Sequence, residues 1–262
     1  MSKTFDRLAL NNRNGDGSLI GYFPIGYPNL TDSIEAAIAM CQNGVDVLEL
    51  GVPYSDPVMD GAVIQEATQS ALKNGIKLSD VFTALERICE NVAVPVLVMT
   101  YWNPVLAYGI DNFARDLAKA GGAGLITPDL IPDEAEQWLE ASDKYDLDRV
   151  FLAAPSSSQM RVQKATNTSR GFVYAVSTMG ITGERADLDA KSRQVVEAVR
   201  IANSNQIVAV GIGISSTEQV REVNAYADAA IVGSAFVKSY QESGLDGLIK
   251  KVRELANGKR NA

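Results

Sequence analysis

Short apolar runs alternate along this chain with longer segments in which apolar residues recur every three or four positions. The runs are rich in Val, Ile, Leu and Ala, as is typical of strands in a parallel sheet that is covered on both faces. The longer segments have the spacing of amphipathic helices. The eight predicted strands are Leu19–Phe23, Val45–Leu50, Val94–Thr100, Gly124–Thr127, Val150–Ala154, Phe172–Ser177, Ile207–Val210 and Ala229–Val232.

Helix-start signals fall between the predicted strands. Asp32 precedes Glu35 by three residues, and Asp133 precedes Glu136 and Ser215 precedes Glu218 in the same way, which is the spacing of a capping box. We therefore expect helices to begin at these three points. The pattern also predicts a short helix before the first strand and an extra helix after the second, because Val63–Val92 holds two helical segments.

Eight alternating strand and helix units favour a (β/α)8 TIM barrel over an open doubly wound α/β sheet. The chain has 262 residues, of which 46% are hydrophobic and 21% charged. This is enough apolar material for one large core, and barrels of this class usually form single domains of about 250 residues. No Pro- or Ser-rich linker divides the sequence. We therefore expect residues 1–262 to form one TIM-barrel domain.

The charge of the chain argues against two classes of partner. The net charge is −8 and the pI about 4.7, whereas a protein that binds nucleic acid or an anionic membrane surface needs a basic stripe. Residues 1–14 lack the apolar centre of a signal peptide, and no apolar run approaches the roughly 18 residues of a membrane span. We therefore expect a cytoplasmic protein that binds neither nucleic acid nor membrane.

Histidine is absent from the chain, and the two cysteines, Cys41 and Cys89, lie far apart in helix-like segments. Neither a CxxC spacing nor a histidine is available to complete a zinc site, so we expect no metal and no disulfide framework. Acid–base chemistry near neutral pH then has to come from carboxyl, tyrosine, lysine or thiol groups.

A carboxyl group at the end of the second strand is the first candidate for catalysis, because reacting groups of TIM barrels lie where the strands end. Glu49 shares one face of its strand with Val45 and Val47, which predicts that it points into the barrel at the rim. Burial there raises the pKa of a carboxyl group and suits a proton shuttle. A structural carboxylate satisfied by a hydroxyl or backbone group fits the same position.

Two further acids, Asp56 and Asp60, lie on the loop that follows. Each stands in a turn-forming dipeptide, Asp-Pro and Asp-Gly, so turn formation alone accounts for both. For Asp56 we favour turn formation or contact with a partner protein. Asp60 is far enough from Glu49 along the chain for the loop to fold back over the barrel mouth and bring the two acids together.

Glycines after the seventh and eighth strands predict a phosphate site. Gly211 and Gly213 follow the seventh strand, and Gly233 and Ser234 follow the eighth, where a helix begins. Backbone N–H groups at a helix start bind anions, and these two loops are the usual phosphate cradle of TIM barrels. The Gly-x-Gly pair also matches half of a dinucleotide fingerprint, but without its continuation. The polar segment Thr178–Asp189 fits either a mobile lid or an ordinary loop.

The block Leu48–Pro57, followed by Asp60-Gly61 and Ile64-Gln65, resembles the signature of the tryptophan synthase alpha chain family. Similar segments follow in the family's order, so the resemblance spans strands two to eight. These segments are Thr100–Pro104, Pro128–Leu130, Tyr174, Gly180–Gly183, Val210–Ser215 and Val232–Ala235.

This resemblance implies a TIM-barrel lyase of tryptophan biosynthesis that cleaves indole-3-glycerol phosphate to indole and glyceraldehyde 3-phosphate. It implies that Glu49 is the general acid and base, acting at indole C3 and the glyceryl hydroxyl, and that Asp60 accepts the indole N–H. It also implies substrate or phosphate contacts, which match Tyr22, Tyr174, Thr182, Gly183, Gly213, Gly233 and Ser234.

The resemblance further implies a partner, the tryptophan synthase beta chain, which uses pyridoxal phosphate, in an α2β2 complex with an indole tunnel. Asp56, Asn103 and Pro104 match the segments that face this partner. No cofactor is implied in the chain itself. Two alternatives remain within the family: a stand-alone lyase that releases free indole, and a non-catalytic activator of the beta chain. Another phosphate-binding barrel, such as an isomerase of a phosphoribosyl intermediate, fits the fold but does not need two acids around this loop.

Five positions depart from the common pattern of the family. Ala62 stands for the usual Pro, Met59 for a small residue, Ile212 for a frequent Phe and Thr178 for an Arg, and Ile131 is an insertion. None of these changes removes a catalytic group. A looser second loop and an altered indole pocket are expected to change the basal rate or its coupling to the partner.

Overall fold

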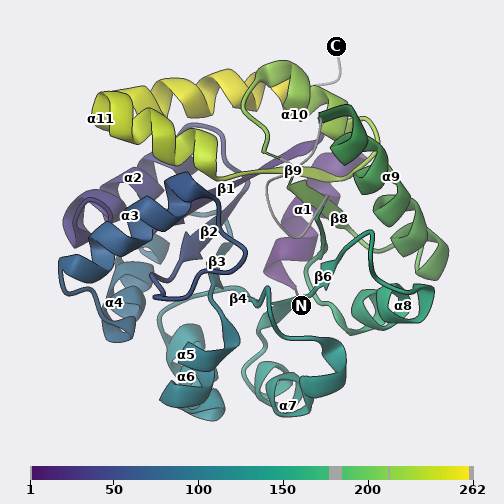
Figure 1. Cartoon of the computed structure of the whole chain (residues 1–262), viewed down its shortest axis with the longest axis horizontal. Coiled ribbons are helices and arrows are strands. Elements are labelled where there is room, and N and C mark those ends of the chain that lie inside the picture. Colours follow the sequence, from purple (N-terminus) through teal and green to yellow (C-terminus); the bar gives the residue numbers. More distant parts are fainter. Residues whose placement is uncertain (1, 177–184, 212, 260–262) are drawn as a thin grey trace.

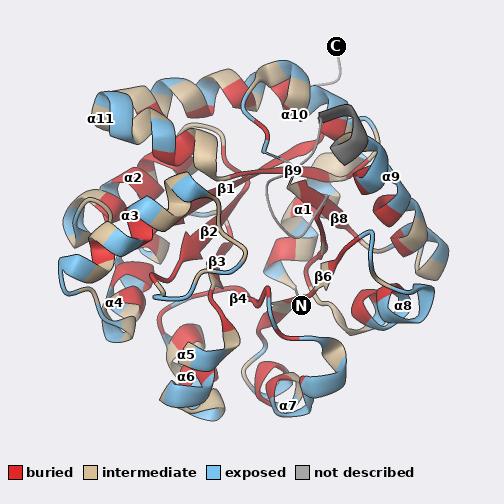
Figure 2. Ribbon diagram, viewed as in Figure 1, coloured by how far each residue is buried: buried red, intermediate tan, exposed pale blue. Residues whose placement is uncertain are grey.

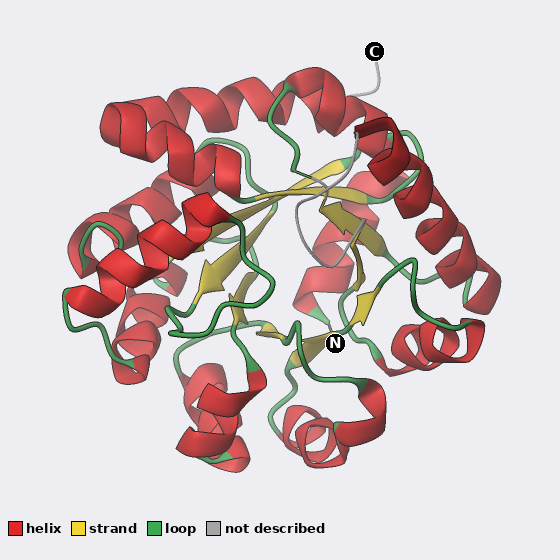
Figure 3. Cartoon of the chain, viewed as in Figure 1, coloured by secondary structure: helices red, strands yellow, loops and turns green. Residues whose placement is uncertain are grey.

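The computed structural model describes residues 2–176, 185–211 and 213–259, and of residues 185–188 only the backbone. A ring of helices surrounds the strands (Figures 1 and 3). The strands are β1 (Ser18–Pro24), β2 (Val47–Gly51), β3 (Val96–Met99), β4 (Gly124–Ile126), β5 (Asp148–Val150), β6 (Leu152–Ala153), β7 (Val173–Val176), β8 (Val208–Gly211) and β9 (Ala229–Val232). The helices are α1 (Lys3–Arg13), α2 (Leu30–Gln42), α3 (Ala62–Lys73), α4 (Leu78–Cys89), α5 (Trp102–Tyr108), α6 (Ile110–Lys119), α7 (Glu136–Lys144), α8 (Gln159–Thr168), α9 (Arg185–Ala202), α10 (Thr217–Asn224) and α11 (Ser234–Ala256), with 3-10 turns at Pro132–Glu134 and Asn257–Lys259.

The described strands form one parallel sheet in the order β5-β4-β3-β2-β1-β9-β8-β7-β6. The two end strands, β5 and β6, are consecutive in the chain and only Phe151 separates them. The sheet therefore closes through the chain itself, and the predicted TIM-barrel fold is confirmed. The prediction of one fifth strand over Val150–Ala154 is wrong in detail. The strand is split at Phe151 into two short pieces that pair with different neighbours, β5 with β4 and β6 with β7.

The predicted extra helices are confirmed, whereas three predicted helix starts are wrong. α1 precedes the first strand, and α3 and α4 both follow β2. The cap of α2 is Asn29, whose side chain accepts from the N–H of Asp32, so the helix begins before the predicted point. The cap of α10 is Ser216, which forms a capping box with Gln219 instead of the predicted box one residue earlier. Asp133 lies in a 3-10 turn, and α7 begins only at Glu136, without a side-chain cap. None of the described helices is long and apolar enough to cross a membrane.

Side chains that point into the barrel form two layers. Ile20 of β1, Val47 of β2 and Leu97 of β3 belong to a closed apolar cluster at the lower level, together with Leu8 of α1. Two residues further along the first two strands, Tyr22 and Glu49 reach the upper level and line a cavity. Figure 2 shows that the strands are mostly buried while the helices expose their outer faces. The alternation along each strand thus sets the depth at which each inward side chain lies.

Acidic side chains at the lower end of the barrel hold the first helix and the end of the described chain in place. Asp46, just before β2, is 1% exposed and accepts hydrogen bonds from the N–H of Leu19, from Arg7 at 2.7 Å and from Lys259 at 2.8 Å. Burial alone would raise the pKa of Asp46, but the charge of Lys259 and these hydrogen bonds outweigh it and hold the pKa below its ordinary value. Asp228, before β9, likewise accepts from Asn12 of α1.

We predict that Asp46→Asn lowers the free energy of unfolding at pH 7 by about 2 to 3 kcal/mol, because two partly buried cations lose their counter-charge. Urea unfolding followed by circular dichroism measures this change. The pKa of Asp46 is lower in the native state, so its contribution is lost as the pH falls through that pKa. The difference between variant and wild type should therefore shrink below about pH 4.

The control is Asp111→Asn, which removes an ion pair between Asp111 and Lys144 in which both side chains are 58% exposed. Exposed pairs contribute little to stability, so the urea midpoint should not change. An equal loss of stability in the two variants would contradict the role given to Asp46.

Candidate active site

The carboxyl group of Glu49 lies buried at the rim of the barrel. In the ladders of β2, Glu49 is flanked by Tyr22 of β1 and Leu97 of β3. It is 1% exposed, and neither carboxyl oxygen has a hydrogen-bond partner among the described residues. Burial raises the pKa of Glu49 to about 8. At neutral pH the group therefore holds a proton that it can donate and take back.

Asp60 lies on the loop between β2 and α3, as the sequence predicts, and lines the same cavity as Glu49. Burial raises the pKa of Asp60 to about 6, and a hydrogen bond from the Tyr101 hydroxyl counteracts part of the rise. The loop is held by the Gln65 side chain, which donates to the Asp60 carbonyl at 2.9 Å. One cavity thus contains a carboxyl group that is protonated near pH 7 and a second that is mostly ionised, which is how environment divides acid and base roles.

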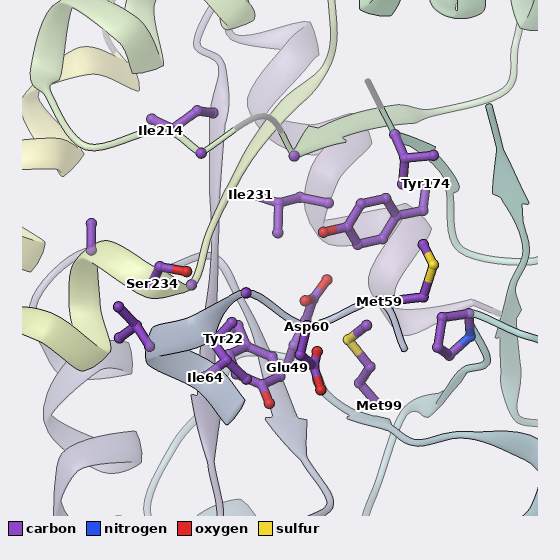
Figure 4. Close-up of a pocket in the computed structure, with 18 of the residues that line it drawn as sticks. Tyr22, Glu49, Met59, Asp60, Ile64, Met99, Tyr174, Ile214, Ile231 and Ser234 are labelled. Carbon is purple, nitrogen blue, oxygen red and sulfur yellow. The ribbon is translucent and has the colours of Figure 1, made fainter. Parts of the chain in front are cut away.

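Tyr22 and Tyr174 complete the polar wall of the cavity (Figure 4). Burial first, and then the charges of the two carboxyl groups, raise the pKa of both hydroxyls well above the ordinary value, so both stay protonated. Glycines make room for them. A Cβ at Gly51 would lie 2.0 Å from the Tyr22 hydroxyl oxygen, and one at Gly211 would lie 2.6 Å from that of Tyr174. Gly211 therefore has a steric role besides the phosphate contact predicted for it.

The other polar part of the cavity is built from backbone at the ends of β8 and β9. Gly213 has a φ of +69°, a conformation that favours glycine. Gly233 stands before the first turn of α11 and caps it without a side chain. The first N–H groups of a helix have no partner within the helix, and here Ser234 and Ala235, which carry two of them, line the cavity. This arrangement suits an anion such as a phosphate group.

One cationic side chain, which the sequence prediction missed, also lines the cavity. Lys238, one turn beyond Ser234 on α11, is the single cationic side chain among the described residues that line the cavity. It lies 3.8 Å from Glu242, and both side chains are exposed. Its spacing of four from Ser234 was the available signal, because residues four apart share a helix face.

The whole cavity has a volume of about 400 Å³, and the rest of its lining is mostly apolar. In Figure 4 Ser234 lies on one side of the carboxyl groups, and Met59 and Met99 lie on the other. The cavity therefore combines an anion site near Ser234 with apolar side chains beyond the acids, among them Met59 and Met99. Sequence reasoning did not assign the apolar wall, which extends to both sides of the acids and comprises Met59, Val63, Ile64, Met99, Pro128, Leu152, Val176, Ile214 and Ile231.

The residues predicted to face a partner lie outside this cavity. Asp56 is exposed and accepts from the Ser55 hydroxyl at 2.6 Å. Asn103 is exposed on the first turn of α5 beside Pro104, and its amide donates to the Tyr54 hydroxyl at 3.3 Å. Predicted positions Thr182 and Gly183, and the departures at Thr178 and Ile212, lie outside the described residues.

Comparison with known proteins connects this geometry to a family. The family model for the tryptophan synthase alpha chain matches residues 8–261. The tryptophan synthase alpha chain of Leifsonia xyli subsp. xyli is 57% identical over 258 residues, which cover 98% of each chain. That of Mycobacterium marinum is 51% identical over 256 residues, covering 98% of this chain and 93% of the relative.

This chain belongs to the tryptophan synthase alpha chain family. Solved structures agree with the assignment. A chain of Mycobacterium tuberculosis tryptophan synthase has a TM-score of 0.94 and 48% identity, covering 100% of this chain and 99% of that one. A chain of the tryptophan synthase complex of Pyrococcus furiosus has a TM-score of 0.82 and 34% identity, covering 92% and 98%.

Membership of the tryptophan synthase alpha chain family confirms the resemblance found in the sequence. It makes this chain a lyase of tryptophan biosynthesis and sets aside the alternative of a phosphoribosyl isomerase. Two of the departures from the family pattern lie at the site: Met59 lines the cavity, and Ala62 opens α3 next to Gly61, which also lines it. Ile131 is 39% exposed and lies away from the cavity lining.

We predict that Glu49→Gln stabilises the fold by about 1 to 3 kcal/mol at pH 8.5, because a buried group without a partner no longer has to ionise. The pKa of Glu49 is about 8 in the native state against an ordinary 4.5. Wild type therefore binds a proton on folding between these values and loses stability as the pH rises through them. Urea unfolding at pH 4 and at pH 8.5 measures the effect.

The matched control is Glu66→Gln, which makes the same change at an exposed position of α3. It should leave the urea midpoint unchanged at both pH values. A Glu49→Gln variant that gains no stability between pH 4 and pH 8.5 relative to wild type would contradict the raised pKa.

Proposed function

We propose that this chain cleaves indole-3-glycerol phosphate to indole and glyceraldehyde 3-phosphate by a retro-aldol reaction. The observation that supports the proposal best is the pair of acids in one cavity, Glu49 with a pKa of about 8 and Asp60 with a pKa of about 6. An anion site on one side of them and the apolar side chains of Met59 and Met99 on the other match the phosphate and the indole of this substrate.

Binding would use the two sides of the cavity separately. The phosphate would lie at the start of α11 and on the β8–α10 loop, against the N–H groups near Gly213, Gly233 and Ser234, with Lys238 as an added cation. The indole ring would lie among the apolar side chains near Met99. We also propose, from the resemblance, that Thr182 and Gly183 contact the substrate.

The chemical steps would use the two acids in turn. Protonated Glu49 gives its proton to indole C3, and the ionised Asp60 accepts a hydrogen bond from the indole N–H and stabilises the resulting cation. The bond between C3 and the glyceryl carbon then breaks, and its electron pair restores the aromatic ring. The glyceryl hydroxyl, which becomes the aldehyde, returns its proton to the Glu49 carboxylate. Because the protonated ring itself accepts the electrons, we propose that this chain needs no cofactor of its own.

We further propose that the chain works with a tryptophan synthase beta chain that carries pyridoxal phosphate, in an α2β2 assembly. The solved relative from Pyrococcus furiosus is a tryptophan synthase complex. On this chain the predicted contact residues Asp56, Asn103 and Pro104 lie near two exposed apolar side chains, Val58 at 83% and Leu106 at 52% exposure. The loop that carries Asp56 also carries Asp60, so a partner on this surface has a direct route to the site.

We also propose that this protein is cytoplasmic. Both cysteines, Cys41 and Cys89, are free in the structure. Free thiols fit a reducing compartment, in which structural disulfides are rare.

We predict that Glu49→Gln lowers the rate of indole release from indole-3-glycerol phosphate by at least about 100-fold, since general acid–base groups usually contribute about 10²- to 10⁴-fold. The replacement keeps the size of the side chain and removes its titrating group. Glu66→Gln, the exposed control on α3, should keep the wild-type rate. Survival of more than about a tenth of the activity in Glu49→Gln would refute the proton-shuttle role.

The same assay with a beta chain added distinguishes a partner-dependent lyase from the two alternatives within the family. The rate for wild type should rise on addition, whereas the rate for Glu49→Gln should stay low in both conditions. A wild-type rate that is high alone and unchanged by the beta chain would instead identify a stand-alone lyase. A chain that activates the beta subunit but releases no indole in any condition would be the non-catalytic activator.

A further inference from the structure

The hydroxyl group of Tyr101 lies behind the loop that carries Asp60. Tyr101 is 6% exposed and is not among the residues that line the cavity, whereas Asp60 is. Its hydroxyl oxygen accepts a hydrogen bond from the N–H of Met59 at 2.8 Å, and the hydroxyl lowers the pKa of the Asp60 carboxyl group. One buried hydroxyl thus holds the backbone just before Asp60 and stabilises the charged form of Asp60.

The surroundings of Tyr101 fix the position of this hydroxyl. Its ring stacks on that of Tyr54, with centroids 5.3 Å apart and planes inclined by 29°. The next residue, Trp102, begins α5, and its N–H donates to both carboxylate oxygens of Asp129, at 2.8 and 3.1 Å. The tyrosine is therefore held through its ring and through the adjacent backbone, so that its hydroxyl is preorganised toward the loop.

We infer that Tyr101 is a positioning residue for Asp60: from outside the cavity its hydroxyl holds the end of the β2–α3 loop and directs the Asp60 carboxylate, in its ionised form, into the cavity. The inference deepens the proposed function and rests on it for its catalytic meaning. Tyr101 acts through Asp60, since its own side chain is not part of the cavity wall.

The sign of the effect on Asp60 follows from the hydrogen bond. A donor to a carboxylate stabilises the charged form and lowers the pKa, so loss of the Tyr101 hydroxyl should raise the pKa of Asp60 above its present value of about 6. Glu49, with a pKa of about 8, stays protonated over the range in which Asp60 titrates. The titratable and charged groups that face Asp60 are Tyr22 of β1, Glu49 of β2, Tyr101 before α5, Tyr174 of β7 and, across the cavity, Lys238 of α11.

The test is Tyr101→Phe, which removes the hydroxyl and keeps the ring that stacks on Tyr54. Tyr108→Phe is the matched control, because the Tyr108 hydroxyl also donates to a carboxylate, that of Asp116 at 2.7 Å, away from the cavity. Carbon-13 NMR of the aspartate carboxyl groups, with Asp60→Asn to assign the signal, gives the pKa of Asp60 in each full-length chain. We expect a rise of about one pH unit in Tyr101→Phe and no change in Tyr108→Phe.

Kinetics give a second readout of the same shift. The acid limb of the pH profile of kcat/KM for indole-3-glycerol phosphate should move up by the same amount. At pH 6 Tyr101→Phe should then be about fivefold slower than wild type, and the two should converge near pH 8, where Asp60 is ionised in both. A defect of equal size at every pH would mean a merely structural role and would overturn the inference.

A measurement on the intact tyrosine covers the case in which Tyr101→Phe folds poorly. In wild type labelled with carbon-13 tyrosine, the Tyr101 signal should follow the titration of Asp60, and this dependence should vanish in Asp60→Asn. An unchanged pKa of Asp60 in Tyr101→Phe, an equal shift in Tyr108→Phe, or a Tyr101 signal that ignores the titration would each overturn the inference. If wild type cleaves no indole-3-glycerol phosphate, the proposed function fails, while the NMR titrations still decide whether Tyr101 positions Asp60.

Discussion

The carboxyl group of Glu49 is taken out of water by the alternation of side chains along β2, and no described residue offers it a hydrogen bond. Below it the barrel is filled by apolar side chains such as Val47 and Ile20, so the ionised form has no support from beneath. Burial therefore moves its pKa from 4.5 to about 8, into the range in which proton transfer is useful at neutral pH. A chain without histidine obtains its proton shuttle in this way.

The two ends of the barrel shift the pKa of a buried carboxyl group in opposite directions. At the lower end Asp46 is as buried as Glu49, each being 1% exposed, but Arg7 and Lys259 bind it and its pKa falls. At the upper end Glu49 has no hydrogen-bond partner within the described part of the chain. The lower acids join the first helix and the end of the described chain to the barrel, and this closed base allows one destabilising group to be kept at the rim, where the site needs it.

Much of the fold and part of the site could be predicted from the sequence because they depend on local pattern. The alternation of side chains along the strand was enough to predict that Glu49 points into the barrel. The order of the strands was enough to predict that the glycine loops lie at the same end of the barrel as Glu49. The cap of α2 was missed because Asn29 and Asp32 both fit a capping position and only the path of the preceding loop decides between them. The split of the fifth strand reflects pairing of its two pieces with different neighbours, β4 and β7, which local pattern does not show.

The role inferred for Tyr101 and the apolar wall could not be read from the sequence, since they arise where loops from different strands meet. Tyr101 reaches Met59 across 42 positions of the chain, and nothing in its immediate neighbours marks it. The place of Lys238 in the site could have been predicted from the sequence, because its spacing from Ser234 places both residues on one face of a single helix. Side chains that act alone at a strand end are thus easier to predict than those that act through another residue.

The central claim is that desolvation makes Glu49 a proton carrier, and direct titration of its carboxyl group by carbon-13 NMR tests it. The signal is assigned by its loss in Glu49→Gln. The account predicts a midpoint near pH 8 in the native chain. A midpoint near 4.5, the ordinary value for a glutamic acid, would contradict it, because the group would then carry no proton to donate at neutral pH.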